Sequence, residues 1–227
     1  SGTGTGTGTG GTTTGGTTTD DNGGSENQKA TAKTYDFTAL TSADLTALGV
    51  TATEGNNKAT AVVSATSATL SIGATVKQSD SGKFKLEFTN KTNSTLEGAG
   101  DLKTINYNTS STGSASIPAD ISTLATVADL ANIISIPVDG AGTVTVSGKF
   151  GNSTNAAVTD ADKLVAVLYD ASGKKLASQE QATKTSADLS TLSGEVSGAT
   201  TVYVVFYRSS GYGGLKISKI EVAAPAN

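Results

Sequence analysis

The chain has 227 residues and a net charge of −4, and it contains no His, Cys, Met or Trp. These absences exclude disulfides, thiolate metal sites, the Ser/His/Asp triad and any histidine pH switch. The lysines form no basic stripe of the kind that nucleic-acid binding requires, and no apolar run approaches the roughly 18 residues of a membrane span.

A tail rich in Gly and Thr opens the chain. Of residues 1–19, 18 are Gly or Thr, and no apolar side chain precedes Ala30. Residues 1–32 therefore cannot offset the entropy of ordering by burial, and we predict a tether. The Thr-Gly alternation from Thr3 to Gly10 has the period of a strand, so the alternative is a strand that pairs with the sheet edge of a neighbouring copy. No signal peptide is recognised, and Ser1 is the start expected of a processed end.

Residues 33–227 are predicted to form a single all-β domain. β-branched and aromatic residues fall in short runs, and Gly, Asn, Asp and Ser separate these runs about every ten residues, which favours a sandwich or barrel over a parallel sheet. Because the N-terminal half alone would make a thin core, we expect one antiparallel β-sandwich built from both halves. The expected strands are Ala59–Ser64, Thr69–Lys77, Lys83–Asn90, Thr104–Asn108, Asn132–Val138, Thr143–Phe150, Lys163–Asp170, Lys174–Gln181, Ser186–Leu192, Thr201–Arg208 and Leu215–Ala223.

Local signals add a hairpin and two short connecting helices. The run Asp170-Ala-Ser-Gly173 suits a type I turn with Gly173 at positive φ. A capping box, Thr41 to Asp44, predicts a helix that ends at Gly49. Apolar spacings of three and four predict a second helix, capped by Asp120 and running to Ala131.

The acidic residues give no catalytic prediction, because a carboxylate pair must be placed in space before it indicates chemistry. The protein is therefore predicted not to be an enzyme and to carry no cofactor. Asp160 and Asp162 have the oxygen ligands that Ca²⁺ prefers, but the ordinary interpretation is a polar loop cap. The Asn-X-Ser/Thr triplets leave glycosylation open; they begin at Asn90, Asn93, Asn108 and Asn152.

The most distinctive segment runs from Thr201 to Gly214. Both faces of Val202–Tyr207 are apolar, which indicates a central strand buried on two sides. Tyr207, Arg208 (the only arginine) and Tyr212 follow at its end, and tyrosines beside a guanidinium suit stacking and hydrogen bonding to a sugar. We predict these three as ligand-binding residues; the alternative is that Tyr207 lies in the core and Arg208 pairs with a surface acid.

The C-terminal half resembles the β-sandwich accessory domain of secreted bacterial pectate lyases and related surface proteins. The resemblance rests on Ile133–Val146, Leu168-Tyr-Asp with Gly173, Val202-Tyr-Val204 and Leu215–Val222, and residues 34–50 are similar to how such domains open. It implies a jelly-roll-like, extracellular sandwich with a non-catalytic role, and it implies no site residues.

Two functions remain open at this stage. The first is an extracellular or cell-surface module that binds a polysaccharide or cell-envelope glycan and is held by the tail. The second is a structural subunit of an extracellular fibre, in which the N-terminal strand is donated to a neighbouring copy.

Overall fold

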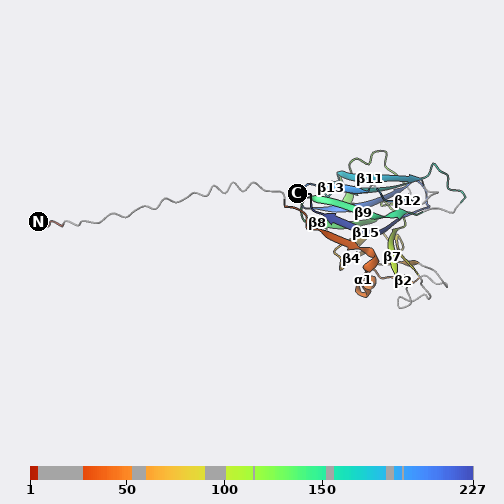
Figure 1. Ribbon diagram of the computed structural model, residues 1–227, viewed down its shortest axis with the longest axis horizontal. Coiled ribbons are helices and arrows are strands. Elements are labelled where there is room, and N and C mark those ends of the chain that lie inside the picture. The colour runs from red at the N-terminus through yellow and green to blue at the C-terminus, as the bar shows by residue number, and fades with distance from the viewer. Residues whose placement is uncertain are drawn as a thin grey trace.

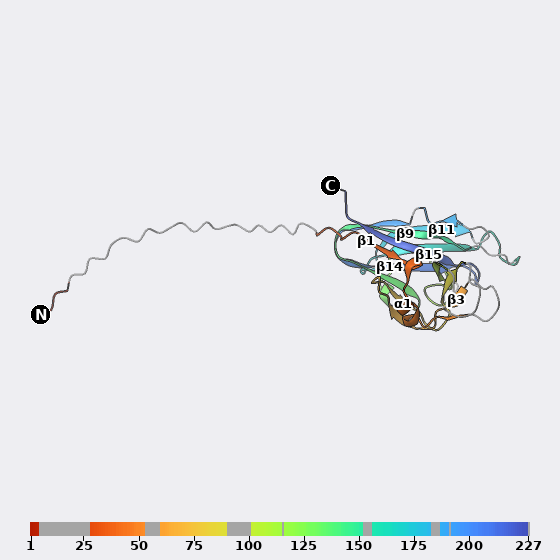
Figure 2. The ribbon, with the colours of Figure 1, turned by 60° about the horizontal axis from the view of Figure 1, so that its bottom comes forward.

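A computed structural model describes residues 1–4, 28–52, 60–89, 101–114, 116–151, 156–182, 187–190 and 192–226. Two antiparallel sheets pack face to face (Figures 1 and 2). The predicted class, an antiparallel β-sandwich with short connecting helices, is confirmed. Among the residues described, no helix is long and apolar enough to cross a membrane.

The larger sheet has the strand order β12-β9-β15-β7-β6-β3-β2, with β1 also paired to β15 and β13 to β9; the smaller has the order β11-β10-β14-β8-β5-β4. The strands have these bounds: β1 Lys33–Asp36, β2 Thr51–Ala52, β3 Thr60–Val62, β4 Ser67–Thr69, β5 Thr75–Lys77, β6 Phe84–Phe88, β7 Leu102–Tyr107, β8 Ile133–Val138, β9 Gly142–Phe150, β10 Lys163–Tyr169, β11 Lys175–Ala182, β12 Ala187–Asp188, β13 Ser193–Val196, β14 Thr200–Arg208 and β15 Leu215–Ala223. The helices are α1 Ser42–Ala47 and the 3-10 turns η1 Phe37–Ala39 and η2 Val127–Asp129.

The main core lies between the two sheets and draws side chains from both halves of the sequence. Strand β6 alternates buried Phe84, Leu86 and Phe88 with half-buried neighbours, as a strand with one face on the core should. On the opposite sheet, Val204 and Phe206 of β14 belong to the same cluster. The outward side chains of β6, β7 and β15 are thereby left free to form a surface.

A second apolar cluster covers the outer face of the smaller sheet. Val205 and Tyr207 of β14 point into it and are fully buried, while Ile121 and Leu124 from the segment between β7 and β8 pack on top. The prediction that β14 is buried on two sides is confirmed, because Phe206 and its alternate neighbours face the main core instead.

Several local predictions hold. Thr41 caps α1 in a capping box with Asp44, and the helix ends before Gly49. Gly173 has φ +84°, and its N–H donates to the Asp170 carbonyl in the predicted hairpin turn.

Three predicted elements are wrong. In place of the expected strand Ser186–Leu192, the structure has β12, Ala187–Asp188, and β13, which begins at Ser193. The run Thr69–Lys77 is a hairpin, β4 and β5, because the chain turns at Leu70–Ala74, where the Leu70 N–H bonds the Ala74 carbonyl. The helix expected from Asp120 to Ala131 is reduced to η2, because backbone groups there bond the β10–β11 hairpin instead. The Leu124 N–H donates to the Gly173 carbonyl and the Ser122 carbonyl accepts from Lys175.

The base of the tail is joined to the domain. The Ala30 N–H donates to the Ala141 carbonyl over 2.7 Å, and Ala30 itself is buried. Thr31 donates through its N–H and its hydroxyl to the Asp139 carboxylate. These contacts begin a few residues before the predicted boundary at residue 33. Most of the Thr-Gly alternation lies outside the described residues, so the tether and the donated strand both stay predictions.

Candidate functional site

A row of polar side chains crosses the outer face of the larger sheet. Strand pairing places Lys85 of β6 opposite Asn106 of β7, Asn106 opposite Lys216 of β15, and Lys216 opposite Lys149 of β9. The neighbours of Lys85, Asn106 and Lys216 along each strand are buried in the core, so the two-residue period of a strand turns this row outward. Adjacent strands lie about 4.8 Å apart, which spaces the row evenly.

The loop that follows β14 forms a wall beside this row. It carries Tyr212, which is 44% exposed and is the one large hydrophobic side chain that is exposed in the described part of the chain. The loop is fixed to the end of β9, because the Gly151 N–H donates to the Gly214 carbonyl over 2.7 Å. An aromatic ring is thus held at the surface on an anchored loop.

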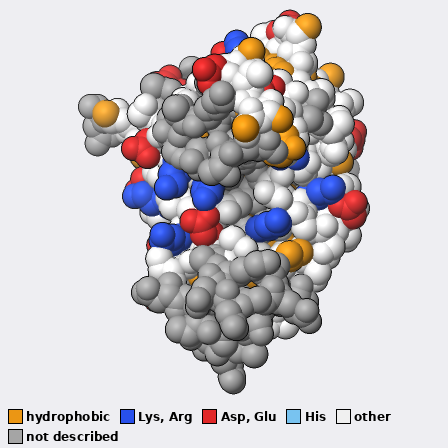
Figure 3. Space-filling model, turned by 90° about the vertical axis from the view of Figure 1, so that its right-hand side faces the viewer, with side chains coloured by type: hydrophobic (Ala, Val, Ile, Leu, Met, Phe, Trp, Pro, Cys, Tyr) orange, Lys and Arg blue, Asp and Glu red, His pale blue; other side chains and the backbone are white. Residues whose placement is uncertain are grey.

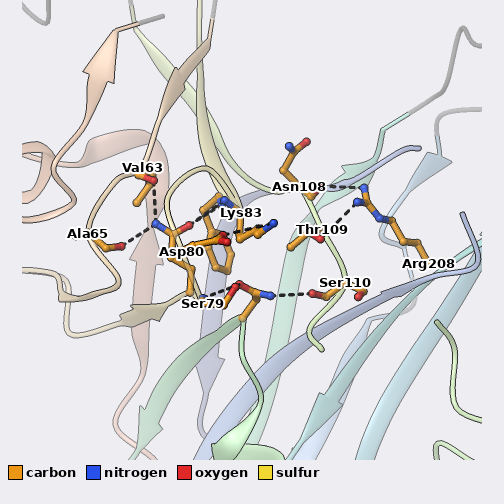
Figure 4. Close-up of polar contacts among 12 residues, drawn as sticks. Val63, Ala65, Ser79, Asp80, Lys83, Asn108, Thr109, Ser110 and Arg208 are labelled. Atoms are coloured by element: carbon orange, nitrogen blue, oxygen red, sulfur yellow. Dashed lines mark hydrogen bonds and ion pairs between the residues drawn. The ribbon is translucent and has the colours of Figure 1, made fainter. Parts of the chain in front are cut away.

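Arg208 ties this wall to the loop that follows β7. One terminal guanidinium nitrogen (Nη1) donates to the carbonyls of Asn108 and Gly213, at 2.8 and 3.0 Å, and the other (Nη2) approaches the Thr109 hydroxyl at 3.4 Å. Figure 4 shows the side chain reaching from β14 toward Asn108 and Thr109. The guanidinium is half-buried and its Nε has no hydrogen-bond partner, so burial lowers the pKa of Arg208 from its ordinary value.

An ion pair lies on the outer face of the larger sheet, within the polar row. The Lys216 Nζ is 2.6 Å from the Glu87 carboxylate, and the Asn106 side-chain amide donates to the same oxygen over 3.4 Å. Burial would raise the pKa of Glu87, but the hydrogen bond and charge of Lys216, with help from Asn106 and Lys103, outweigh burial, and the pKa is lowered. Glu87 is therefore charged at neutral pH.

Together these residues line a groove of about 430 Å³. The base of the tail and the last strand meet near Gly142, where Ala30 and Ala223 both approach. The groove lies at the opposite end of the paired strands β9 and β15, beside Gly151 and Lys216. Figure 3 looks onto this end and shows basic side chains gathered around an acidic one. The groove's lining residues are Thr60, Lys85, Glu87, Asn106, Asn108, Gly151, Arg208, Gly211, Tyr212, Gly213, Gly214 and Lys216.

The structure brings two of the three predicted ligand-binding residues together. Arg208 and Tyr212 both line the groove. Tyr207 is 0% exposed and packs in the second apolar cluster, so its ring has no surface on which to stack a ligand. Arg208 pairs with no acid in the described part of the chain, where its partners are two carbonyls and a hydroxyl.

Sequence reasoning missed the floor of the groove. The two-residue alternation in Phe84–Phe88 and Leu215–Ala223 does place Lys85 and Lys216 on outward faces. Lys85 and Lys216 come close together because β7 lies between β6 and β15 in the sheet. This strand order cannot be deduced from the sequence of either segment.

No described group of three or more acidic side chains could hold a metal ion. The Asp162 carboxylate instead accepts from the backbone N–H of Thr159, over 2.7 Å. Of the four glycosylation triplets, only the asparagine at 108 lies within the described residues; those at 90, 93 and 152 lie outside them.

No family model matches this chain, and neither does any curated protein. Three solved structures show a loose likeness. The CBM36-1 domain of a multidomain xylanase, from the hindgut metagenome of Trinervitermes trinervoides, is 13% identical over 57% of this chain and 81% of its own length, with a TM-score of 0.33. The CBM22-1–CBM22-2 tandem domain of Paenibacillus barcinonensis Xyn10C is 12% identical over 88% and 47%, with a TM-score of 0.35.

The third structure comprises the CBM51-2 domain in complex with GlcNAc and the INT domains of Clostridium perfringens ZmpB. It is 12% identical over 73% of this chain and 37% of its own length, with a TM-score of 0.35. This chain thus spans less than half the length of the second and third structures. None of the three comes from a pectate lyase, so that resemblance stays a prediction.

Proposed function

We propose that this protein is a non-catalytic, extracellular or cell-surface module that binds a polysaccharide in the groove between β6, β7, β15 and the loop after β14. The observation that carries the proposal is Tyr212: an exposed ring on an anchored loop, beside a floor of amide and ammonium groups. Aromatic faces stack on the apolar faces of sugar rings, and amides and cations bond sugar hydroxyls.

The position of the groove also supports a binding role. The chain enters and leaves the sandwich at the end where Ala30 and Ala223 meet, and the groove lies at the other end. A module held by either terminus would present the groove to a ligand without obstruction from its attachment.

The test is binding of the whole chain to a panel of soluble polysaccharides, measured by affinity gel electrophoresis. Tyr212→Ala should weaken binding about tenfold, the size of one lost aromatic contact, while Tyr212→Phe keeps the ring and should bind like the wild type. Tyr203→Phe, on the smaller sheet, is the matched control. If the wild type binds no polysaccharide, or if Tyr212→Ala binds as well as Tyr212→Phe, the proposal is wrong.

The fibre subunit stays an untested prediction. Its sharpest test is deletion of residues 1–27, which leaves the docked residues from Gln28 onward in place. Under the binding-module proposal, sedimentation velocity gives the same oligomeric state and the polysaccharide affinity is unchanged. Assemblies that form with the tail and vanish without it would favour the fibre instead.

A further inference from the structure

The charges in the groove are unevenly distributed. The whole chain has an excess of acidic residues, at 16 basic against 20, but the described residues that line the groove include three cations and one carboxylate. The cations are Lys85, Arg208 and Lys216, and the carboxylate is Glu87. A locally positive groove on a negative protein is a feature that a neutral ligand would not require.

Two of these three cations have no acidic partner among the residues that the structure describes. Glu87 is 2.6 Å from Lys216 and neutralises it. Arg208 bonds two backbone carbonyls and a hydroxyl, all uncharged. Lys85 makes no ion pair with any residue that the structure describes. Lys85 and Arg208 therefore keep their charges uncompensated in the groove.

The surroundings reinforce this imbalance. Lys149 continues the cross-strand row beyond Lys216 and is exposed. Lys103, on β7, is also exposed and lies close enough to Glu87 to lower the pKa of its carboxyl. An anionic ligand in the groove would therefore be surrounded by lysine and arginine side chains, with Glu87 as the one described carboxylate among them.

We infer that the groove selects acidic glycans, with Lys85 and Arg208 meeting the carboxylate or sulfate of a sugar that stacks on Tyr212. This inference rests on the proposed function and narrows its ligand class. A carboxylate or sulfate bound by a cation in a partly desolvated groove makes charge-assisted hydrogen bonds, which are about twice as strong as neutral ones.

The experiment compares matched pairs of polysaccharides by affinity electrophoresis and titration calorimetry. Methyl esterification removes the carboxylate charge of polygalacturonate and adds a methyl group, whereas dextran sulfate and dextran differ only in the sulfate. We expect the charged member of at least one pair to bind about tenfold more tightly than its neutral partner, with the preference shrinking as salt screens the charges.

Two substitutions with opposite expected signs sharpen the test. Lys85→Ala should weaken binding of the acidic glycan about tenfold, because it removes a free cation. Glu87→Gln should strengthen the same binding, because it removes the one carboxylate and frees Lys216. Lys174→Ala, at the other end of the sandwich, removes the same charge as Lys85→Ala and should change nothing.

The outcomes distinguish the inference that the groove selects acidic glycans from the proposal that it binds glycans at all. Equal binding of the charged and neutral members of both pairs overturns the acidic-glycan inference and leaves the glycan-binding module standing. A DNA oligonucleotide that binds as tightly as the acidic glycan also overturns the inference, since it would show a surface for any polyanion. Binding to none of the polysaccharides overturns both.

Discussion

Replacing Arg208 by Lys keeps the positive charge of the groove. It removes the planar, forked guanidinium that joins the loop after β7 to the loop after β14. A lysine ammonium cannot reach the carbonyls of Asn108 and Gly213 and the hydroxyl of Thr109 in the geometry that the guanidinium uses. The substitution is conservative in charge alone, so it separates the structural role of this residue from its electrostatic one.

The magnitude follows from the contacts. The two bonds to carbonyls, at 2.8 and 3.0 Å, contribute about 1.5 kcal/mol each, the lower end for charged donors, because the site is half-buried. The bond at 3.4 Å adds little. The unpaired, buried Nε opposes folding by about 1 kcal/mol, and the substitution removes that cost. Arg208→Lys should therefore destabilise the protein by about 2 kcal/mol.

The assay is urea unfolding followed by tyrosine fluorescence and far-UV circular dichroism. Arg208→Met is the matched variant: it keeps a flexible, unbranched stem and loses the charge. If the fork is what matters, Lys and Met lower the free energy of unfolding by similar amounts. Arg208→Lys with the stability of the wild type would refute the role assigned to the guanidinium.

Three further substitutions test contacts that hold the fold together away from the groove. Gln78→Ala should lower the free energy of unfolding in urea by about 3 kcal/mol, because it leaves the Ala65 carbonyl and the N–H groups of residues 83 and 84 without partners. The Val63 carbonyl keeps its bond from the Gly82 N–H. A loss below about 1 kcal/mol would contradict this prediction. Gly140→Ala would place a Cβ 2.2 Å from the Gln28 carbonyl oxygen. The clash should loosen the hydrogen bonds of the Ala30 and Ala141 amides, so these amides should exchange faster with solvent. Gly198→Ala is the control, because its added Cβ meets nothing within 4 Å and should leave amide exchange unchanged. The Asp44 carboxyl has a lowered pKa, because hydrogen bonds from Ser71 and Thr41 outweigh the opposing effect of burial. A pKa depressed in the folded state adds stability that is present above the unfolded value of 3.8 and lost as the pH falls through the folded value. Thermal midpoints of Asp44→Asn should therefore fall less steeply on acidification than those of the wild type, and parallel curves would contradict the assignment.

The strand pattern and local turn chemistry were readable from the sequence because they depend on near neighbours. The capping box at Thr41 and the hairpin turn at Gly173 each close within a few residues. The helix expected after Asp120 failed for the opposite reason. Its apolar spacing was real, but those side chains cover β10 and β14, and the backbone bonds a hairpin about 50 residues further along the chain.

In the candidate site too, the features set by nearby residues could be predicted and those set by distant strands could not. The apolar character of both faces of Val202–Tyr207 already implied that Tyr207 would be covered, and the structure shows what covers it. Tyr212 follows a strand end, and its exposure agrees with its position in a Gly-rich loop. The cross-strand row of Lys85, Asn106 and Lys216 could not be predicted, because it requires β15 to pair with β7, a strand more than 100 residues earlier in the sequence.

The central claim is that the groove between β6, β7, β15 and the loop after β14 binds a glycan. The most direct test is amide chemical-shift mapping by NMR as an oligogalacturonate is titrated into the whole chain. We predict that the shifted amides cluster at Lys85, Asn106, Asn108 and residues 211–216. Shifts that cluster instead in the crevice between residues 170–176 and 195–200 at the other end, or no shifts with this or any neutral oligosaccharide, would contradict the claim.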